Sequence, residues 1–383
     1  MSYMDEALAQ ARLAMGRTSP NPAVGALIVK DGVIASRGHT QPPGGPHAEI
    51  VALQQAGEAT RGATLYVTLE PCCYFGRTPP CTQAIITVGL AEVHIATLDP
   101  NPRVAGQGRA ELEAAGIHTV VGEGEEEAKA INEAYCKYIT TGLPLVIAKF
   151  SVSLDGKIAT RTGDSRWVAG EASREYVHWL RDTTDAIMVG VGTVLIDDPQ
   201  LTTRPSQVDP VRGVRHPLRI IADSTARTPP SAAVLKGPGR VLVATGPLPE
   251  ERLAPLRDAG AEVMVLPLKG GHIDVSELLR ELGRRQVTGV IVEGGGKLLG
   301  SFFDANLVDK VMVFVAPVIV GGRRAVPAVA GLGVAHMAQA LRLQRVSIQR
   351  FGDDTLITGY LNSSLAGAAE GLGEAGKGGP RCH

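Results

Sequence analysis

The sequence predicts an α/β protein with two domains. Its 383 residues exceed what a single hydrophobic core usually serves. Strand-like and helix-like segments alternate along most of the chain, which is typical of sheets covered by helices. The run Gly142-Leu143-Pro144 ends a helical segment and precedes a new β-rich block. We therefore expect one domain over residues 1–143 and a second over residues 144–361.

The first domain is expected to open with a helix and a β-hairpin. Helical periodicity covers residues 4–15, and two β-prone runs, 24–29 and 33–36, flank Lys30-Asp31-Gly32. Asp-Gly between such runs is a strong hairpin signal. A Pro- and Gly-rich segment follows and precedes His47. We expect a helix to begin at His47 and to end near Ala56. The alternation then continues with strands 64–69, 92–96 and 117–121 and helices 81–88, 105–115 and 125–140.

The segment from His47 to Cys81 predicts a catalytic zinc site. Zn²⁺ favours nitrogen and sulfur ligands, and a catalytic zinc keeps three protein ligands and one open position. His47, Cys72 and Cys81 supply that number, which leaves Glu49 free to transfer protons. Cys73 is a poor alternative to Cys81, because neighbouring thiols point apart. A structural zinc site or unrelated buried cysteines are the competing interpretations, although a structural site usually needs a fourth ligand.

The pattern around these residues resembles the H-x-E…P-C-x-x-C signature of zinc-dependent nucleobase and nucleotide deaminases. It departs from that signature because eight residues, not two, separate Cys72 from Cys81. Three blocks look more specifically like the riboflavin-biosynthesis deaminase family. These blocks are residues 18–25 (TSPNPAVG), 71–81 (PCCYFGRTPPC) and 99–108 (DPNPRVAGQG).

This resemblance implies a cytidine-deaminase-like, three-layer α/β/α domain that removes an amino group from 2,5-diamino-6-ribosylamino-4(3H)-pyrimidinone 5′-phosphate. It implies that Asn21 contacts the pyrimidine and that Arg77 and Asn101 face the ribose phosphate. An arginine in the insert suits a phosphate, because the guanidinium offers a planar pair of donors. Arg77 could instead be a solvated loop residue, and Asn101 could serve turn formation.

The second domain is predicted to be α/β as well. Its expected strands are 145–152, 186–191, 218–222, 240–245, 262–266, 287–293 and 310–320, and its expected helices are 171–181, 275–285 and 297–305. A closing hairpin, 341–351 with 355–361, brackets Gly352-Asp353-Asp354. The run 293–301 (EGGGKLLGS) predicts a strand, a glycine turn and a helix start that could cradle a phosphate. It lacks the G-x-G-x-x-G spacing and the N-terminal position of a Rossmann motif.

Three further segments resemble the reductase half of bacterial riboflavin enzymes, which is similar in fold to dihydrofolate reductase and uses NADPH. They are residues 148–159 (AKFSVSLDGKIA), 163–167 (GDSRW) and 189–204 (VGVGTVLIDDPQLTTR). The cofactor contacts that this resemblance implies are Ser151, Trp167, Thr193, Asp197, Ser224, Gly295, Gly296, Lys297, Leu298, Leu299, Gly300 and Ser301. The implied substrate contacts are Lys149, Ser165, Arg181, Leu201, Arg204 and Glu293. Simple core packing is the alternative for Trp167, and either Lys149 or Asp197 is a candidate proton donor.

Together these features predict a bifunctional enzyme of riboflavin biosynthesis. The second activity would reduce the ribosyl side chain of 5-amino-6-(5-phosphoribosylamino)uracil to ribityl with NADPH. A nucleic-acid-editing deaminase is disfavoured by the net charge of −1 and by the low aromatic content of 4%. A non-catalytic, zinc-stabilised binding module is the remaining alternative.

The composition also indicates the cellular compartment and the kinds of binding partner that we expect. Five unevenly spaced cysteines do not form a disulfide framework and fit metal binding in a reducing compartment. No signal-peptide pattern and no apolar run of about 18 residues are present, so we expect a cytoplasmic protein without a membrane partner. The expected partners are a small phosphorylated pyrimidine and, by the resemblance, further copies of the chain. Residues 362–383 read as a disordered tail.

Overall fold

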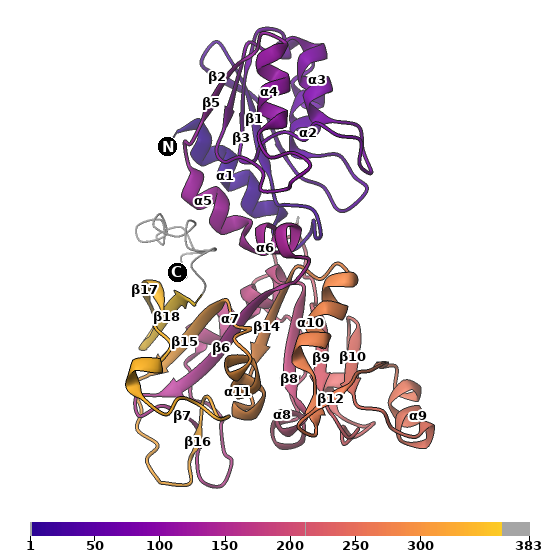
Figure 1. Ribbon diagram of the computed structural model, residues 1–383. Helices are drawn as coiled ribbons and strands as arrows, with labels where there is room; N and C mark the ends of the chain where they lie inside the picture. Colours follow the sequence, from indigo (N-terminus) through magenta and orange to yellow (C-terminus); the bar gives the residue numbers. More distant parts are fainter. Residues whose placement is uncertain (1, 211, 362–383) are drawn as a thin grey trace. The chain divides into compact units, whose positions relative to one another are not determined.

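The computed structural model describes residues 2–210 and 212–361, which fall into two compact units (Figure 1). The first unit ends at Gly142 and the second begins at Leu143. Each unit is built on one main β-sheet with helices packed against it, which confirms the predicted α/β class. The tail predicted to be disordered, 362–383, lies outside the described residues.

The first unit contains a five-stranded sheet in the order β2-β1-β3-β4-β5. The predicted hairpin is present, with β1 antiparallel to both β2 and β3, whereas β3, β4 and β5 run parallel to one another. The strands are β1 (Gly25–Lys30), β2 (Val33–His39), β3 (Thr64–Val67), β4 (Glu92–Ile95) and β5 (His118–Val121). The carboxyl ends of β3 and β4 therefore lie side by side.

Helices cover both faces of this sheet. The helices of this unit are α1 (Tyr3–Ala14), α2 (Ala48–Ala56), α3 (Cys81–Val88), α4 (Gln107–Ala114), α5 (Glu125–Ile131) and α6 (Glu133–Thr141), with a 3₁₀ turn η1 (Gly57–Thr60). Ala26 and Ile28 of β1 share a buried cluster with residues of α2, α3, α4 and α6. Leu27, which points to the opposite face, packs with residues of α1 and α5. The expected three-layer α/β/α arrangement is confirmed.

One helix expected over residues 125–140 is in fact two, α5 and α6, which are separated at Asn132. The buried Asn132 side chain accepts a hydrogen bond from the backbone N–H of Ala23 (2.8 Å) and donates one to the Ala23 carbonyl (2.9 Å). This long-range pair fixes Asn132 outside helical geometry, at φ −107°. The helical period in the sequence continues through the break and does not reveal it.

The second unit contains a nine-stranded mixed sheet in the order β11-β10-β9-β8-β14-β6-β15-β18-β17. Strands from β11 to β15 in this order are parallel, and the closing hairpin β17–β18 adds the antiparallel edge. The strands are β6 (Leu145–Ser153), β8 (Ala186–Gly190), β9 (Leu218–Ala222), β10 (Val241–Thr245), β11 (Glu262–Val265), β14 (Gly289–Glu293), β15 (Lys310–Ala316), β17 (Gln344–Phe351) and β18 (Asp354–Tyr360). Two short pairs, β12 (Leu268–Lys269) with β13 (His272–Ile273) and β7 (Lys157–Ala159) with β16 (Val326–Pro327), lie outside it.

The helices of the second unit include two that the sequence did not predict, α8 and α9. The set is α7 (Glu171–Thr183), α8 (Val191–Asp197), α9 (Glu250–Asp258), α10 (Val275–Arg284) and α11 (Gly296–Asp304), with 3₁₀ turns η2 (Ala233–Leu235) and η3 (Met337–Gln339). At seven residues α8 is too short to show a helical period, and α9 contains Pro255. Over residues 2–210 and 212–361, no helix combines the length and the apolar character needed to cross a bilayer.

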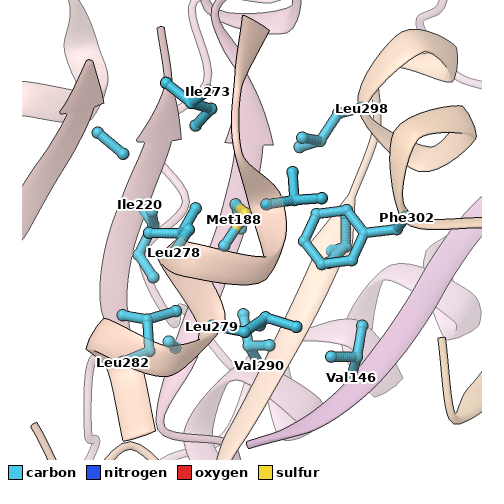
Figure 2. Close-up of a cluster of buried hydrophobic side chains, with 14 of the residues drawn as sticks. Val146, Met188, Ile220, Ile273, Leu278, Leu279, Leu282, Val290, Leu298 and Phe302 are labelled. Carbon is cyan, nitrogen blue, oxygen red and sulfur yellow. The ribbon is translucent and has the colours of Figure 1, made fainter. Parts of the chain in front are cut away.

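The main core of the second unit lies between the sheet and helices α10 and α11. Figure 2 shows Leu278, Leu279 and Leu282 of α10 and Phe302 of α11 facing side chains from several parallel strands. Phe302 has no solvent exposure. These helices therefore rest on a continuous apolar face that spans β6, β8, β9 and β14.

Replacement of this phenyl ring should destabilise the second unit strongly. We expect Phe302→Ala to lower the free energy of unfolding by about 3–5 kcal/mol, because it removes apolar contacts and leaves a cavity. Both tryptophans, Trp167 and Trp179, lie in this unit, so their fluorescence in a urea titration reports its unfolding. The half-buried neighbour Phe303 gives a matched control, since Phe303→Ala should cost clearly less. Equal losses of unfolding free energy for the two variants would contradict the deeper burial of Phe302.

Candidate active sites

A group of three potential metal ligands lies in the first unit, at the edge of the sheet where the parallel strands β3 and β4 end. His47 is the extended N-cap residue of α2, Cys72 lies in the loop after β3, and Cys81 is the first residue of α3. The Nδ1 atom of His47 lies 3.5 Å from the Sγ of Cys72 and 3.4 Å from the Sγ of Cys81. All three ligand atoms lie within 4.8 Å of one another. One imidazole nitrogen and two thiols at this spacing fit a tetrahedral zinc ion with one open position.

The surroundings favour a thiolate at Cys72. The pKa of the Cys72 thiol falls to about 4, chiefly because it accepts a hydrogen bond from Cys81 and another from His47. The backbone N–H of Cys81, at the N-terminus of α3, also points at the Cys72 sulfur at 3.4 Å. Cys73, by contrast, points toward the carbonyl oxygen of Arg103, 3.8 Å away. The structure thus separates the two neighbouring cysteines.

Glu49 lies in the first turn of α2 beside the three ligands. Its side chain is buried, with 4% of the residue exposed, and it shares a hydrogen bond with the Cys81 thiol. Burial raises the pKa of the Glu49 carboxyl, while the nearby His47 charge opposes that rise. A carboxyl group whose pKa is raised toward neutrality is suited to accept and return a proton.

The insert between Cys72 and Cys81 folds over this group and contacts the loop after β4. The hydroxyl of Thr78 lies 3.4 Å from Nε2 of His47. The Asn101 amide donates to the Tyr74 hydroxyl at 3.4 Å, and the Arg103 guanidinium stacks 4.1 Å from the Tyr74 ring centre. Arg77 is exposed in the same insert. The structure therefore brings Asn101 to the loop that carries Arg77.

Asn101 and Asn21 both also take part in turns. The Asn101 side chain accepts the backbone N–H of Arg103 at 3.0 Å, which is the turn chemistry expected as an alternative for this residue. Asn21 closes a turn with Thr18 before β1, through a backbone hydrogen bond of 2.8 Å and a second bond from the Thr18 hydroxyl. Local turn formation and a substrate contact are compatible at both positions.

The second unit contains a large cleft of about 1730 Å³. Nearly all of the residues implied by the reductase resemblance line it. They are Lys149, Ser151, Ser165, Trp167, Arg181, Thr193, Asp197, Leu201, Arg204, Ser224, Glu293, Gly295, Gly296, Lys297, Leu298, Leu299 and Ser301. Gly300 faces elsewhere, because a side chain there would meet the carbonyl oxygen of Ala330 at 2.0 Å. Segments as far apart in the sequence as Lys149 and Ser301 thus share one cleft.

Glu293 is held between two cations at the floor of this cleft. Lys149 and Glu293 are paired in register on the parallel strands β6 and β14, and their side chains form an ion pair of 2.8 Å. Arg181 of α7 contacts the other carboxylate oxygen, also at 2.8 Å. Burial alone would raise the pKa of Glu293, but the charges of Arg181 and Lys149 outweigh burial and hold this pKa well below its usual range.

The glycine turn after Glu293 has the geometry of an anion-binding site. Gly294 and Gly295 have φ values of 74° and 80°, and a side chain on Gly295 would approach the Thr193 hydroxyl at 3.1 Å. Gly295 is the N-cap of α11 and has no side chain to satisfy the first backbone N–H groups of the helix. These donors and the helix dipole face the cleft, as an anion site requires.

Other cleft residues show how the walls are built. The Ser165 hydroxyl donates to the Asp197 carboxylate at 2.8 Å. Trp167 is 71% exposed and carries the Arg174 guanidinium 4.8 Å from its ring centre, so it is not a core residue. An exposed aromatic face at the edge of a cleft can pack against a flat ring.

Sequence reasoning missed two residues of these sites, Thr78 and His178. His178 of α7 lines the cleft and accepts the backbone N–H of Arg204 at 3.1 Å. Burial, together with the charges of Arg181 and Arg204, lowers the His178 pKa to about 4. The sequence did contain a signal for His178. It lies three residues before Arg181 in a predicted helix, and residues at this spacing share a helix face.

Comparisons with known proteins agree with both sites. Residues 1–97 match the family model for the cytidine and deoxycytidylate deaminase zinc-binding region, and residues 144–357 match that for the RibD C-terminal domain. The chain is 41% identical to the riboflavin biosynthesis protein RibD of Aquifex aeolicus, over 93% of this chain and 97% of that protein. It is 38% identical to RibD of Escherichia coli, with the same coverage of both chains.

Solved structures give the same result. Acinetobacter baumannii RibD superposes with a TM-score of 0.83 at 35% identity, covering 94% of this chain and 98% of that chain. A diaminohydroxyphosphoribosylaminopyrimidine deaminase/5-amino-6-(5-phosphoribosylamino)uracil reductase from Thermotoga maritima gives 0.81 at 35% identity, with the same coverage. These likenesses extend over both units of the chain.

The ion pairs of Glu293 should make the stability of the second unit depend on pH. Because the folded-state pKa is depressed, the stabilisation is present above the ordinary carboxyl pKa of about 4.3 and is lost as the pH falls below it. We expect Glu293→Gln to cost about 3–5 kcal/mol at pH 7, since Lys149 and Arg181 lose their anion. Urea titrations followed by tryptophan fluorescence give the free energy of unfolding of each protein. The difference in this free energy between wild type and Glu293→Gln should become smaller below that pH.

The matched control is Glu281→Gln, which removes a more exposed carboxylate that pairs with Arg284 on α10. Its effect should stay within about 1 kcal/mol at any pH, as for surface ion pairs in general. If the loss of unfolding free energy caused by Glu293→Gln did not depend on pH, this result would contradict the depressed pKa of Glu293.

Proposed function

The chain belongs to the RibD family, and from this membership we propose how its two sites divide the two activities. It is a bifunctional enzyme of riboflavin biosynthesis, a zinc-dependent deaminase and an NADPH-dependent reductase. We assign the deaminase to residues 1–143 and the reductase to residues 144–361. The observation that carries the first assignment is the convergence of His47, Cys72 and Cys81 on one point beside the buried Glu49.

In the deaminase site, His47, Cys72 and Cys81 would hold the zinc ion, which lowers the pKa of a water molecule toward neutrality when bound. Glu49 accepts the proton released by this water and delivers it to the departing amino group. The reaction replaces a C–NH₂ bond of the pyrimidine by C=O and releases ammonia. Asn21 orients the pyrimidine, while Arg77 and Asn101 bind the ribose phosphate. The Tyr74–Asn101 contact supports the last assignment, because it joins the insert to the loop after β4.

In the reductase cleft, the glycine turn at 294–296 would bind the phosphates of NADPH, which would supply the hydride when bound. Ser151, Trp167, Thr193, Asp197 and Ser224, with residues 297–301 of α11, complete the proposed cofactor contacts. Ser165, Leu201 and Arg204 hold the substrate together with the triad Lys149, Arg181 and Glu293. All of these assignments except that of Gly300 are supported by the shared cleft.

Opening of the ribosyl ring to a ribityl chain needs a proton as well as a hydride. Lys149 is the better of the two candidate donors. Its ammonium carries a proton and is oriented by the 2.8 Å contact with Glu293, whereas the Asp197 carboxylate already accepts the Ser165 hydroxyl. Protonation of the substrate by Lys149 would leave the remaining positive charge on Arg181 to balance Glu293.

The two competing functions are not favoured. A nucleic-acid-editing deaminase with an accessory domain and a non-catalytic zinc module would not be expected to match RibD proteins along 93% of the chain. The shared length includes the entire reductase cleft, which neither alternative needs.

Replacement of the proton carrier and of a metal ligand should separate their roles. We expect Glu49→Gln to retain zinc but to lose ammonia release by at least about 10²-fold, because proton transfer fails. Cys81→Ser should lose zinc and deamination together, whereas Cys73→Ser should retain both. Metal analysis and an ammonia assay check these outcomes. Reduction of supplied 5-amino-6-(5-phosphoribosylamino)uracil should be nearly unchanged in all three, and its loss would argue against two separable units.

We further propose that the enzyme acts in the cytoplasm as a homo-oligomer on small phosphorylated pyrimidines, without a nucleic-acid partner. The near-zero net charge supports the last point. Light scattering on the full chain should give a mass of at least two chains, and a gel-shift assay with single-stranded DNA should show no retardation. A single-chain mass or a retarded band would contradict the respective part of this proposal.

A further inference from the structure

A buried carboxylate, Glu70, stands two residues before the first metal-ligand cysteine and plays no part in the mechanism above. Only 3% of Glu70 is exposed. Its backbone N–H continues the ladder between β3 and β4 by donating to the Thr97 carbonyl at 3.0 Å. The side chain therefore enters the space between these two strand ends, beneath the loop that follows β4.

Three backbone N–H groups of that loop converge on the carboxylate. Asp99 and Gly106 donate to Oε2 of Glu70, at 3.1 Å and 2.9 Å, and Arg109 donates to Oε1 at 2.9 Å. Gly106 is the N-cap of α4 and Arg109 lies in its first turn, so Glu70 caps this helix from another element. One side chain thus holds both ends of the loop 99–106.

Between these two anchor points the loop carries the groups that face the insert. Asn101 reaches the Tyr74 hydroxyl, and Arg103 stacks on the Tyr74 ring. The Asp99 end of the loop is also held by the Tyr135 hydroxyl, which donates to the Asp99 carboxylate at 3.0 Å. Glu70 is the side chain that joins both ends of the loop, Asp99 and Gly106, to the segment that carries Cys72.

The first turn of α4 lies close to Glu70 and to the residue after it. A side chain on Gly108 would meet the Pro71 carbonyl oxygen at 2.1 Å and the Glu70 side chain at 3.3 Å. The start of α4 is thus in close contact with residues 70–71. The hydrogen bonds of Glu70 fix the position of the loop relative to these residues.

We propose that Glu70 is a positioning residue of the deaminase, which sets the Asn101 loop at the distance from the metal ligands that the phosphorylated pyrimidine requires. This inference rests on the proposed function, because it assumes that Asn101 contacts the substrate. Glu70 acts through the loop and contacts neither the reacting atoms nor the metal ligands. Its removal should therefore weaken substrate binding more than the chemical step.

The test is steady-state deamination by the zinc-loaded full chain carrying Glu70→Ala or Glu70→Gln. We expect Glu70→Ala to raise KM at least about tenfold while kcat changes less than about threefold, as expected for lost substrate positioning. Glu70→Gln keeps one acceptor oxygen and should fall between wild type and Glu70→Ala. Zinc content and the reductase rate, measured on the same samples, should stay at wild-type levels.

Glu113→Ala provides the matched control, since Glu113 lies at the other end of α4 and pairs with the side chain of Arg109. Its KM should not change. Unchanged KM in both Glu70 variants, or a fall in kcat that accompanies zinc loss at constant KM, would overturn the inference. If Glu70→Ala fails to fold, Glu70→Gln alone decides. Absence of deamination by the wild-type chain would instead refute the proposed function.

Discussion

Parallel pairing of neighbouring strands determines where both sites lie. In such pairs the carboxyl ends fall at the same edge of the sheet, so the loops that follow them are neighbours. In the first unit, Val67 of β3 is paired with Ile95 of β4, which places the loop of Cys72 beside the loop of Asn101. In the second unit, Glu293 of β14 is paired directly with Lys149 of β6. The loops that carry Cys72 and Asn101 and the glycine turn after Glu293 all depend on this common geometry.

Three buried glutamates show how environment sets the role of a carboxyl group. Glu293 remains charged because two cations contact it directly. Glu70 accepts hydrogen bonds from three backbone N–H groups, which hold the loop that donates them. At Glu49 burial outweighs the opposing effects of the His47 charge and of hydrogen bonding, so the pKa is raised, as suits a proton carrier. The same side chain thus serves as the anion between two cations at Glu293 and as a loop anchor at Glu70, and Glu49 is the proposed proton carrier.

The insert between Cys72 and Cys81 joins the candidate metal ligands to the loop after β4. Its Thr78 contacts the metal-ligand imidazole, while its Tyr74 contacts the loop of Asn101. A shorter connection of two residues, as in the general deaminase signature, could not reach both. The length of this loop therefore fits a deaminase whose substrate carries a sugar phosphate as well as a pyrimidine ring.

The sequence by itself determined the elements whose signals are local. The Asp-Gly hairpin, the helix that begins at Cys81, and the strand and glycine turn around Glu293 all follow from neighbouring residues, and the spacing of His47, Cys72 and Cys81 already indicated zinc. Only the tertiary structure decided the features that rest on distant partners. Asn132 breaks a periodic helix because it pairs with Ala23, and Glu70 captures N–H groups 29 to 39 residues away. The cation contacts of Glu293 span 112 and 144 residues. A residue pattern encodes local backbone preference, whereas these contacts exist only once the strands have paired and the loops at their ends have met.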